Sequence, residues 1–264
     1  MKHVNGNEVL YHIGLSKNNV EKAEYAILIN DKKYVEAIAK FIDPHAEYIN
    51  ENREYFSYLA NFNSQKIVVI STGLGGPAMG IGLEEMATVG LKYFVRLGET
   101  GALQNYINIG DFILSKGAMR YEATSTHYAP DNYPAVASLE MTNTFEEVLK
   151  EQKLTYYTGV TVTTDAFWAA QERKSGYLNY VPIKFQNVLN EWKQLNVLSV
   201  DMELATLFTL CNVFGLESVA ILDVVNKNFE SDDIHKPDDD KRLKNWKAIL
   251  THALKKDMKR RGKI

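Results

Sequence analysis

Apolar positions along the chain follow two patterns that alternate. Short runs that are apolar throughout predict strands buried on both faces, and segments with apolar residues three and four positions apart predict helices. The expected strands are residues 25–29, 66–72, 92–98, 110–120, 157–165, 197–202 and 218–226. The expected helices are residues 31–42, 75–90, 142–152, 202–215 and 239–260.

This alternation of strands and helices indicates an α/β fold with a largely parallel sheet covered on both faces. No internal repeat or linker interrupts it, so we expect one domain over residues 1–264. Ligands of such sheets bind beyond the carboxyl ends of the strands. The candidate strand ends are Gly73, Gly98, Asp165, Asp201 and Asn226.

Composition narrows the class of protein. The chain is 45% hydrophobic and 24% charged, as in ordinary globular proteins, and its net charge of −3 gives no general reason to expect nucleic acid or an acidic membrane surface as a partner. No run approaches the ~18 apolar residues of a membrane span. The single Cys211 cannot form an internal disulfide, which favours a reducing, cytoplasmic setting.

Two successive expected strands end in glycine-rich turns. The first, "STGLGGPAMGIGLEE" (71–85), contains G-x-G-x-x-A, but the next strand lacks the acidic end that a dinucleotide site needs and ends instead in "RLGETG" (96–101). Two such turns suggest that the backbone of both contacts one small ligand. Alternatively, their glycines only allow a helix to pack closely on a strand. There is no Cys/His cluster with metal-ligand spacing, so no metal site is expected.

The turn "RLGETG" combines the elements of an anion site with a negative charge. Arg96, Thr100 and the glycine N–H groups would converge on an anion. Glu99 places a carboxylate in the same spot. Either the turn does not bind an anion, or something else has taken the anion's place.

The segment 163–177 offers an aromatic ring, a carboxamide and a guanidinium in Phe167, Gln171 and Arg173. Such a set suits a flat base that stacks on one side and hydrogen-bonds along its edge, although an ordinary loop with a buried Phe is equally consistent. Further on, Asp201 and Glu203 lie where an expected strand meets a helix. They could cap that helix, or bind a sugar diol.

Seven segments follow one another as in the bacterial hexameric type of uridine phosphorylase, within the nucleoside phosphorylase superfamily. They are "HIGLSK", "NREYFS", residues 71–104, "INIGDFIL", "THYAPDNYPAV", "GVTVTTDAFWAAQER" and "DMELATLFTLCNVFGL". The resemblance implies a single-domain α/β fold with a twisted mixed sheet flanked by helices. It also implies a cytoplasmic enzyme of pyrimidine salvage that needs no cofactor, assembled as a hexamer built from dimers whose subunits complete one another's sites.

The resemblance also implies roles for the candidate residues of the nucleoside site. Phe167 would stack on the base, while Gln171 and Arg173 read a pyrimidine edge from the opposite side of the pocket. Met202 and Glu203 would bind the ribose, together with Thr100 at its junction with phosphate and His12 from a neighbouring subunit.

For phosphate, the resemblance implies Gly73, Arg96 and a neighbour's Arg53, and Lys227 matches an arginine beside the leaving base. The phosphate site departs from the family pattern, since Asn30 replaces a glycine, Tyr34 an arginine and Glu99 a threonine. We therefore count Glu99, Thr100 and Lys227 as candidate catalytic residues, and expect Glu99 to pair with Arg96 or with the neighbour's Arg53.

Three functions stay open at this point. A phosphorylase would transfer the ribosyl group of uridine to phosphate, giving uracil and ribose 1-phosphate. A nucleoside hydrolase would use water oriented by Glu99. A nucleoside-binding protein with little catalysis would keep the base pocket alone.

Overall fold

The secondary structure alternates much as the apolar pattern predicts. In this computed structural model, residues 5–227, 229 and 238–264 are described. The strands are β1 (Tyr25–Ile29), β2 (Glu47–Asn52), β3 (Tyr55–Phe62), β4 (Gln65–Ser71), β5 (Tyr93–Ala102), β6 (Phe112–Tyr121), β7 (Ala135–Val136), β8 (Tyr156–Thr164), β9 (Ser199–Asp201) and β10 (Glu217–Asn226). The α-helices are α1 (Val35–Ile42), α2 (Gly76–Thr88), α3 (Leu139–Glu151), α4 (Val188–Gln194), α5 (Leu204–Phe214) and α6 (Asp239–Arg260), and short 3-10 turns cover Lys32–Tyr34, Thr124–His127 and Ile183–Phe185.

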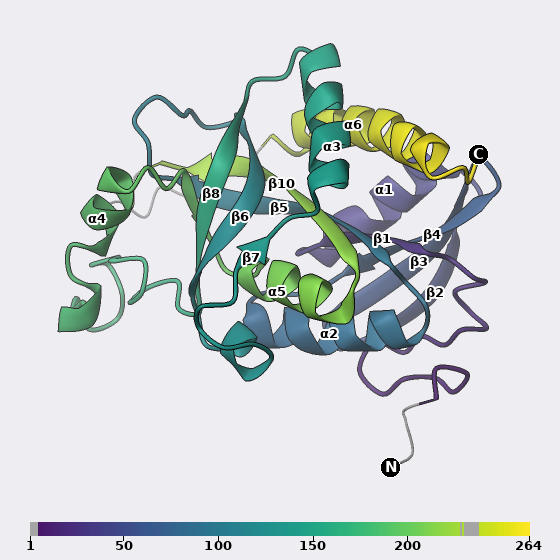
Figure 1. Ribbon diagram of the computed structural model, residues 1–264, viewed down its shortest axis with the longest axis horizontal. Helices are drawn as coiled ribbons and strands as arrows, with labels where there is room; N and C mark the ends of the chain where they lie inside the picture. Colours follow the sequence, from purple (N-terminus) through teal and green to yellow (C-terminus); the bar gives the residue numbers. More distant parts are fainter. Residues whose placement is uncertain (1–4, 228, 230–237) are drawn as a thin grey trace.

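One sheet joins all these strands, and part of it closes on itself. β5 pairs with β10, β10 with β6, β6 with β8, β8 with β9, and β9 returns to β5. From the edge of β5 that also holds β9, the sheet continues outward through β1, β4, β3 and β2. β5 is therefore the strand shared by the closed ring and the open extension (Figure 1).

The sheet is mixed, as the family resemblance implied. Among the described residues, five strand pairings are parallel and five antiparallel. The largely parallel sheet inferred from alternation alone was wrong in this respect, because the unpredicted β2 and β3 pair antiparallel, and so do β6 with β10, β6 with β7, and β5 with β9. β2 has the sequence "EYINEN", with no buried position, so it left no apolar signal. Whether residues 1–264 make a single domain stays a prediction.

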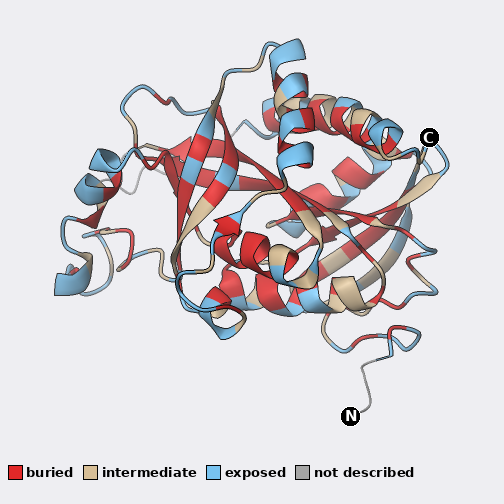
Figure 2. Cartoon of the chain, in the orientation of Figure 1, coloured by how far each residue is buried: buried red, intermediate tan, exposed pale blue. Residues whose placement is uncertain are grey.

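Helices cover both faces of the sheet. α1, α3 and α6 pack over one face in one apolar cluster, and α2 and α5 pack over the other in a second cluster. Figure 1 shows these two layers with the strands between them, and Figure 2 shows that the central strands are buried. None of the helices formed by the described residues is both long and apolar enough to span a membrane.

Successive side chains of β5 point to opposite faces of the sheet, as strand geometry requires. Phe94 packs in the cluster with α2 and α5, whereas Val95 and Leu97 pack in the cluster with α1, α3 and α6. By the same alternation Arg96 and Thr100 belong to the α5 face, and Glu99 belongs to the α6 face. This division decides which partners the charged residues of β5 can reach.

Candidate functional site

The site lies where β5 changes neighbours. β5 pairs with β1 as far as Leu97, opposite Ile29, and with β9 from Gly101, opposite Val200. The residues between, 98–100, have neither strand beside them. A change of neighbour at the carboxyl end of a strand opens a crevice in such sheets, and this is where ligands bind.

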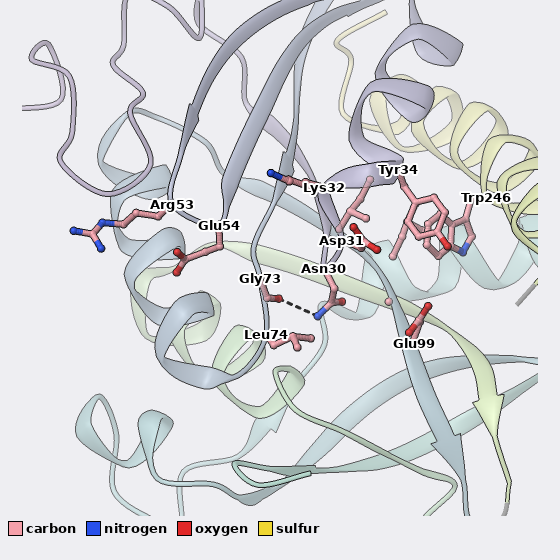
Figure 3. Close-up of a pocket in the computed structure, with 13 residues that line it drawn as sticks. Asn30, Asp31, Lys32, Tyr34, Arg53, Glu54, Gly73, Leu74, Glu99 and Trp246 are labelled. Atoms are coloured by element: carbon pink, nitrogen blue, oxygen red, sulfur yellow. Dashed lines mark hydrogen bonds between the residues drawn. The ribbon is translucent and has the colours of Figure 1, made fainter. Parts of the chain in front are cut away.

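Two cavities meet at this crevice. The Phe167 cavity, of about 330 Å³, is lined by residues that include Thr100, Phe167, Gln171, Arg173, Met202 and Glu203. The Tyr34 cavity, of about 440 Å³, is lined by residues that include Tyr34, Gly73, Arg53 and Trp246 (Figure 3). Asn30, Leu74 and Glu99 line both. The structure thus brings the base and in-chain ribose candidates together in one cavity.

At the base end, the three candidates from one loop form a compact group. The Arg173 guanidinium stacks 4.0 Å from the centre of the Phe167 ring, and its Nε and Nη2 each donate to Gln171 Oε1 at 3.4 Å. Gln171 Nε2 donates to Thr164 Oγ1 at 3.3 Å. We expected Phe167 on the wall opposite Arg173, and this was wrong. The loop turns back on itself through a hydrogen bond from Arg173 N–H to the Trp168 carbonyl, which lays the two side chains together.

At the ribose end, Glu203 is buried and oriented by two donors. Its Oε1 accepts from the Gly75 N–H at 2.7 Å, and its Oε2 accepts from Arg96 Nη2 at 2.5 Å. A carboxylate oxygen can accept two hydrogen bonds, so both oxygens keep capacity for hydroxyl groups. Thr100 Oγ1 donates to the Val200 carbonyl at 2.8 Å, which leaves its lone pairs to accept.

Asp201 caps helix α5, the structural alternative considered for it. Its Oδ2 accepts from the Glu203 and Leu204 N–H groups at 3.0 and 2.8 Å, and Thr163 Oγ1 donates to its Oδ1 at 2.6 Å. Burial raises the pKa of Asp201 to about 6, and the nearby charge of Glu203 adds to the rise.

Arg96 belongs to the ribose end. Its guanidinium is fully buried against Gly98, where a Cβ would lie 3.1 Å from Nη2, so the glycine makes room for the arginine. Among the described residues, Glu203 is its one ion-pair partner, and Nε and Nη1 have no hydrogen-bond partner there.

At the opposite end of the crevice, Glu99 forms an ion pair with Arg242 of α6. The expected pairing with Arg96 was wrong, because the two side chains leave β5 on opposite faces. Pairing with a neighbouring subunit's Arg53 stays a prediction; this chain's own Arg53 points away from the cavity in Figure 3.

Arg242 stands at the centre of a polar group that we call the Arg242 cluster: Tyr34, Glu99, Asp223 and Arg242, all buried except Glu99. Arg242 Nη1 donates to the Tyr34 hydroxyl at 3.1 Å, and its Nε lies 3.0 Å from Asp223 Oδ2. Asp223 stands beside Glu99 in the register of β10 and β5. Burial raises the pKa of Asp223 to about 7; Arg242 opposes the rise and the charge of Glu99 adds to it.

Comparison with known proteins places this geometry in a family. The model of a family described as "Phosphorylase superfamily" matches residues 24–255. The chain belongs to the phosphorylase superfamily. Its relatives include the uridine phosphorylases of Haemophilus influenzae and Escherichia coli K12, 39% and 36% identical over 82% of this chain and 85% of each relative. A guanosine phosphorylase of Halorubrum lacusprofundi is 32% identical over 76% of this chain and 77% of the relative. The resemblance to nucleoside phosphorylases, closest to uridine phosphorylase, is thereby confirmed.

Two candidates of this superfamily member lie at the surface outside the Phe167 cavity. His12 Nδ1 lies 2.6 Å from Glu85 Oε1, and Arg53 Nη2 donates to the Tyr11 hydroxyl at 3.3 Å. Arg53 occupies the turn between β2 and β3, with a φ of 55°. Their predicted action on a neighbour's site stays a prediction, since it concerns another subunit.

Gly73 and Lys227 have different surroundings. Gly73, with a φ of 67°, lines the Tyr34 cavity, and its carbonyl accepts from Asn30 Nδ2 at 3.1 Å (Figure 3). Lys227 lines neither cavity; its Nζ donates to the Asn105 carbonyl at 2.7 Å and to Asn108 Oδ1 at 3.3 Å. The structure therefore does not bring Lys227 together with the base-binding candidates.

Sequence reasoning missed Arg242 and Asp223. Arg242 lies four positions before the buried Trp246 on the apolar stripe of α6, where a charge requires a partner. Asp223 interrupts the apolar run of β10, and that too was a signal. Within the described residues, no group of three His, Cys, Asp or Glu side chains could hold a metal ion.

Proposed function

We propose that this protein cleaves the N-glycosidic bond of a pyrimidine nucleoside, uridine in the first instance, as its relatives named uridine phosphorylase do. The observation that supports this most strongly is the Phe167 cavity, which combines Arg173 and Gln171 at one end with Glu203 at the other. A base edge and a ribose diol would therefore be held by one cavity.

Each of these residues would act on a different part of the nucleoside. Arg173 and Gln171 would bind the carbonyl and N–H edge of uracil, and the guanidinium would stabilise the negative charge that uracil gains as it leaves. Glu203 would accept from the 2′- and 3′-hydroxyls and favour the positive charge that develops at C1′. With phosphate as the acceptor the products would be uracil and ribose 1-phosphate, and with water as the acceptor they would be uracil and ribose.

Uracil release from uridine, followed by chromatography with and without phosphate, tests the proposal. We expect turnover in at least one condition. A Glu203→Gln variant should lose about 100-fold or more in kcat/KM, since it weakens the binding of the diol. An exposed carboxylate of α4 serves as the control, and Glu191→Gln should change the rate less than twofold. Absence of turnover in both conditions, with no uridine binding by calorimetry, would overturn the proposal; binding without turnover would leave a nucleoside-binding protein.

We also propose self-association, up to a hexamer, in which His12 and Arg53 act in a neighbour's site. Both lie at the surface beside Tyr11, which is 73% exposed, and Arg53 points away from the cavity of its own chain. Mixed assemblies give a direct test. Arg53→Ala and Glu203→Gln variants, each of low activity, should recover activity when co-assembled, because some sites then combine two intact contributions. A protein that sediments as a monomer at micromolar concentration and is fully active would contradict this.

Finally, we propose a reducing, cytoplasmic setting. Cys211 is buried in α5, and burial raises the pKa of its thiol to about 12, so the thiolate form is negligible at neutral pH. Cell fractionation would test the location.

A further inference from the structure

Glu99 occupies the junction of the two cavities. It lines both the Tyr34 cavity and the Phe167 cavity, and its side chain is 47% exposed. The next residue, Thr100, lines the Phe167 cavity together with Met202 and Glu203. The carboxylate therefore borders the volume in which a second reactant would approach the ribose.

The charges around this junction disfavour an anionic reactant. The described residues that line the Tyr34 cavity include three carboxylates, of Asp31, Glu54 and Glu99, and two cations. Both cations are engaged elsewhere. Lys32 Nζ pairs with Glu51 at 2.7 Å, and Arg53 points outward. Within one subunit a phosphate dianion would face an unbalanced negative wall, and a single guanidinium lent by a neighbour's Arg53 would not outweigh three carboxylates.

The two buried arginines nearby do not reverse this balance. Arg96 is fully buried, lines neither cavity and is paired with Glu203. Arg242 also lines neither cavity and stands between the carboxylates of Glu99 and Asp223. Arg96 Nε and Nη1 have no partner among the described residues, but they are buried and Arg96 lines neither cavity, so an anion in the crevice would have to displace protein groups to reach either arginine, whereas neutral water need not.

Arg242 also positions Glu99 for proton transfer. Its Nη1 donates to Glu99 Oε1, so the carboxylate is held from the side of α6. Among the described residues, Glu99 Oε2 accepts no hydrogen bond. A carboxylate with one oxygen fixed and the other open to solvent has the arrangement of a general base.

We propose that water is the acceptor at this site, and that Glu99 is the general base that activates it; this inference rests on the proposed cleavage of uridine. Water attacks C1′ and transfers a proton to Glu99 Oε2. The C1′–N1 bond breaks, and its electron pair goes to N1 of uracil, which then takes up a proton. Glu99 returns its proton to solvent or to the leaving base. The sum is uridine plus water giving uracil plus ribose.

Product analysis of the wild-type protein tests this without any variant. Uridine is incubated in buffer free of phosphate, and then with 10 mM phosphate. Uracil is measured by chromatography, and the sugar is identified by mass spectrometry and by phosphorus NMR. We expect equimolar uracil and free ribose, at a rate that phosphate changes less than twofold. Ribose 1-phosphate as the main product, or cleavage that requires phosphate, would overturn the inference and leave the proposed function standing.

A matched pair of variants then tests the role of Glu99. Glu99→Gln keeps an oxygen for Arg242 but cannot accept the proton, so phosphate-free cleavage should fall about 10²- to 10⁴-fold. Uridine affinity, measured by calorimetry, should stay within threefold. Glu54→Gln removes another carboxylate of the same cavity wall and should change the rate less than threefold. Cleavage by Glu99→Gln at the wild-type rate would refute the assignment, and a wild-type protein that neither binds nor cleaves uridine would overturn the proposed function and this inference together.

Discussion

The two ends of the crevice draw their side chains from different distances along the chain. At the base end, Phe167, Gln171 and Arg173 come from one loop and contact one another. At the other end, Glu99 of β5 pairs with Arg242 of α6, 143 positions later. Residues of one loop stay in contact with one another wherever the fold places that loop, whereas residues of distant elements meet only when the fold packs those elements together. When one such residue is replaced, the new side chain can therefore pair with a residue of a different element, as the Glu99–Arg242 pair illustrates.

The largest effect should come from removing the centre of the Arg242 cluster. Arg242→Met leaves Glu99 and the buried Asp223 without their shared cation, and loss of one partner from a buried ion pair costs about 3–5 kcal/mol of unfolding free energy. Urea denaturation at a fixed protein concentration measures it. Adding Asp223→Leu to Arg242→Met should restore part of the loss. A cost below about 1 kcal/mol would mean that the cluster is not a structural unit.

The pH dependence of stability should reveal Asp223. Its pKa is about 7 in the folded protein and near 3.8 when unfolded, so the folded state holds a proton that the unfolded state releases between about pH 4 and 7. The contribution of Asp223 to the free energy of unfolding should therefore fall as the pH rises through this window and stay level above it. Asp223→Asn should remove this fall, worth about 2–4 kcal/mol. Urea denaturation of both proteins at pH 4.5 and pH 7.5 measures their free energies of unfolding. If the two proteins differ by the same amount at both pH values, the assignment is contradicted.

At the base end, Arg173→Ala should weaken uridine binding by about 1.5–3 kcal/mol, the cost of a lost hydrogen bond from a charged group. Its exposed neighbour in sequence, Lys174, provides the control, because Lys174→Ala changes the net charge equally and lines neither the Phe167 nor the Tyr34 cavity. Calorimetry with uridine measures both variants. Equal effects of the two would indicate a general charge effect rather than a contact with the base.

The smallest effect concerns phosphate. Glu99→Thr removes the carboxylate from the junction and leaves Arg242 paired with Asp223 alone, so phosphate affinity should rise about 10- to 100-fold, or about 1.4–2.7 kcal/mol. Because the Glu99 side chain is about half exposed, solvent screens its charge and limits the gain in phosphate affinity. Titration with phosphate in the presence of uracil measures the change. An unchanged dissociation constant would show that Glu99 does not control the anion end.

Sequence patterns predicted the elements that carry a strong apolar period. β1 has the bounds expected, and α2, α5 and α6 lie within two residues of the expected ranges. β2 was missed because it is polar and has no buried position, whereas β3, "YFSYLANF", is largely buried and its apolar signal was overlooked. The family resemblance, rather than periodicity, indicated a mixed sheet.

For the site, spacing and resemblance together identified Phe167, Gln171, Arg173, Met202 and Glu203, which line one cavity. The partner of Glu99 could not be predicted in the same way. The alternation of β5 excludes Arg96, but only the packing of α6 on that face of the sheet brings Arg242 to Glu99. The predicted roles of His12 and Arg53 in a neighbour's site depend on contacts between subunits rather than on the fold of one chain.

The central claim is that the nucleoside end of this site is intact while the anion end is closed to phosphate. The most direct test is calorimetric titration of the wild-type protein with uracil and, separately, with inorganic phosphate. The account predicts saturable binding of uracil and no saturation by phosphate up to about 10 mM, since the two cations among the described residues that line the Tyr34 cavity are directed elsewhere, and one guanidinium from a neighbour would not outweigh its three carboxylates. A phosphate dissociation constant in the micromolar range would contradict it.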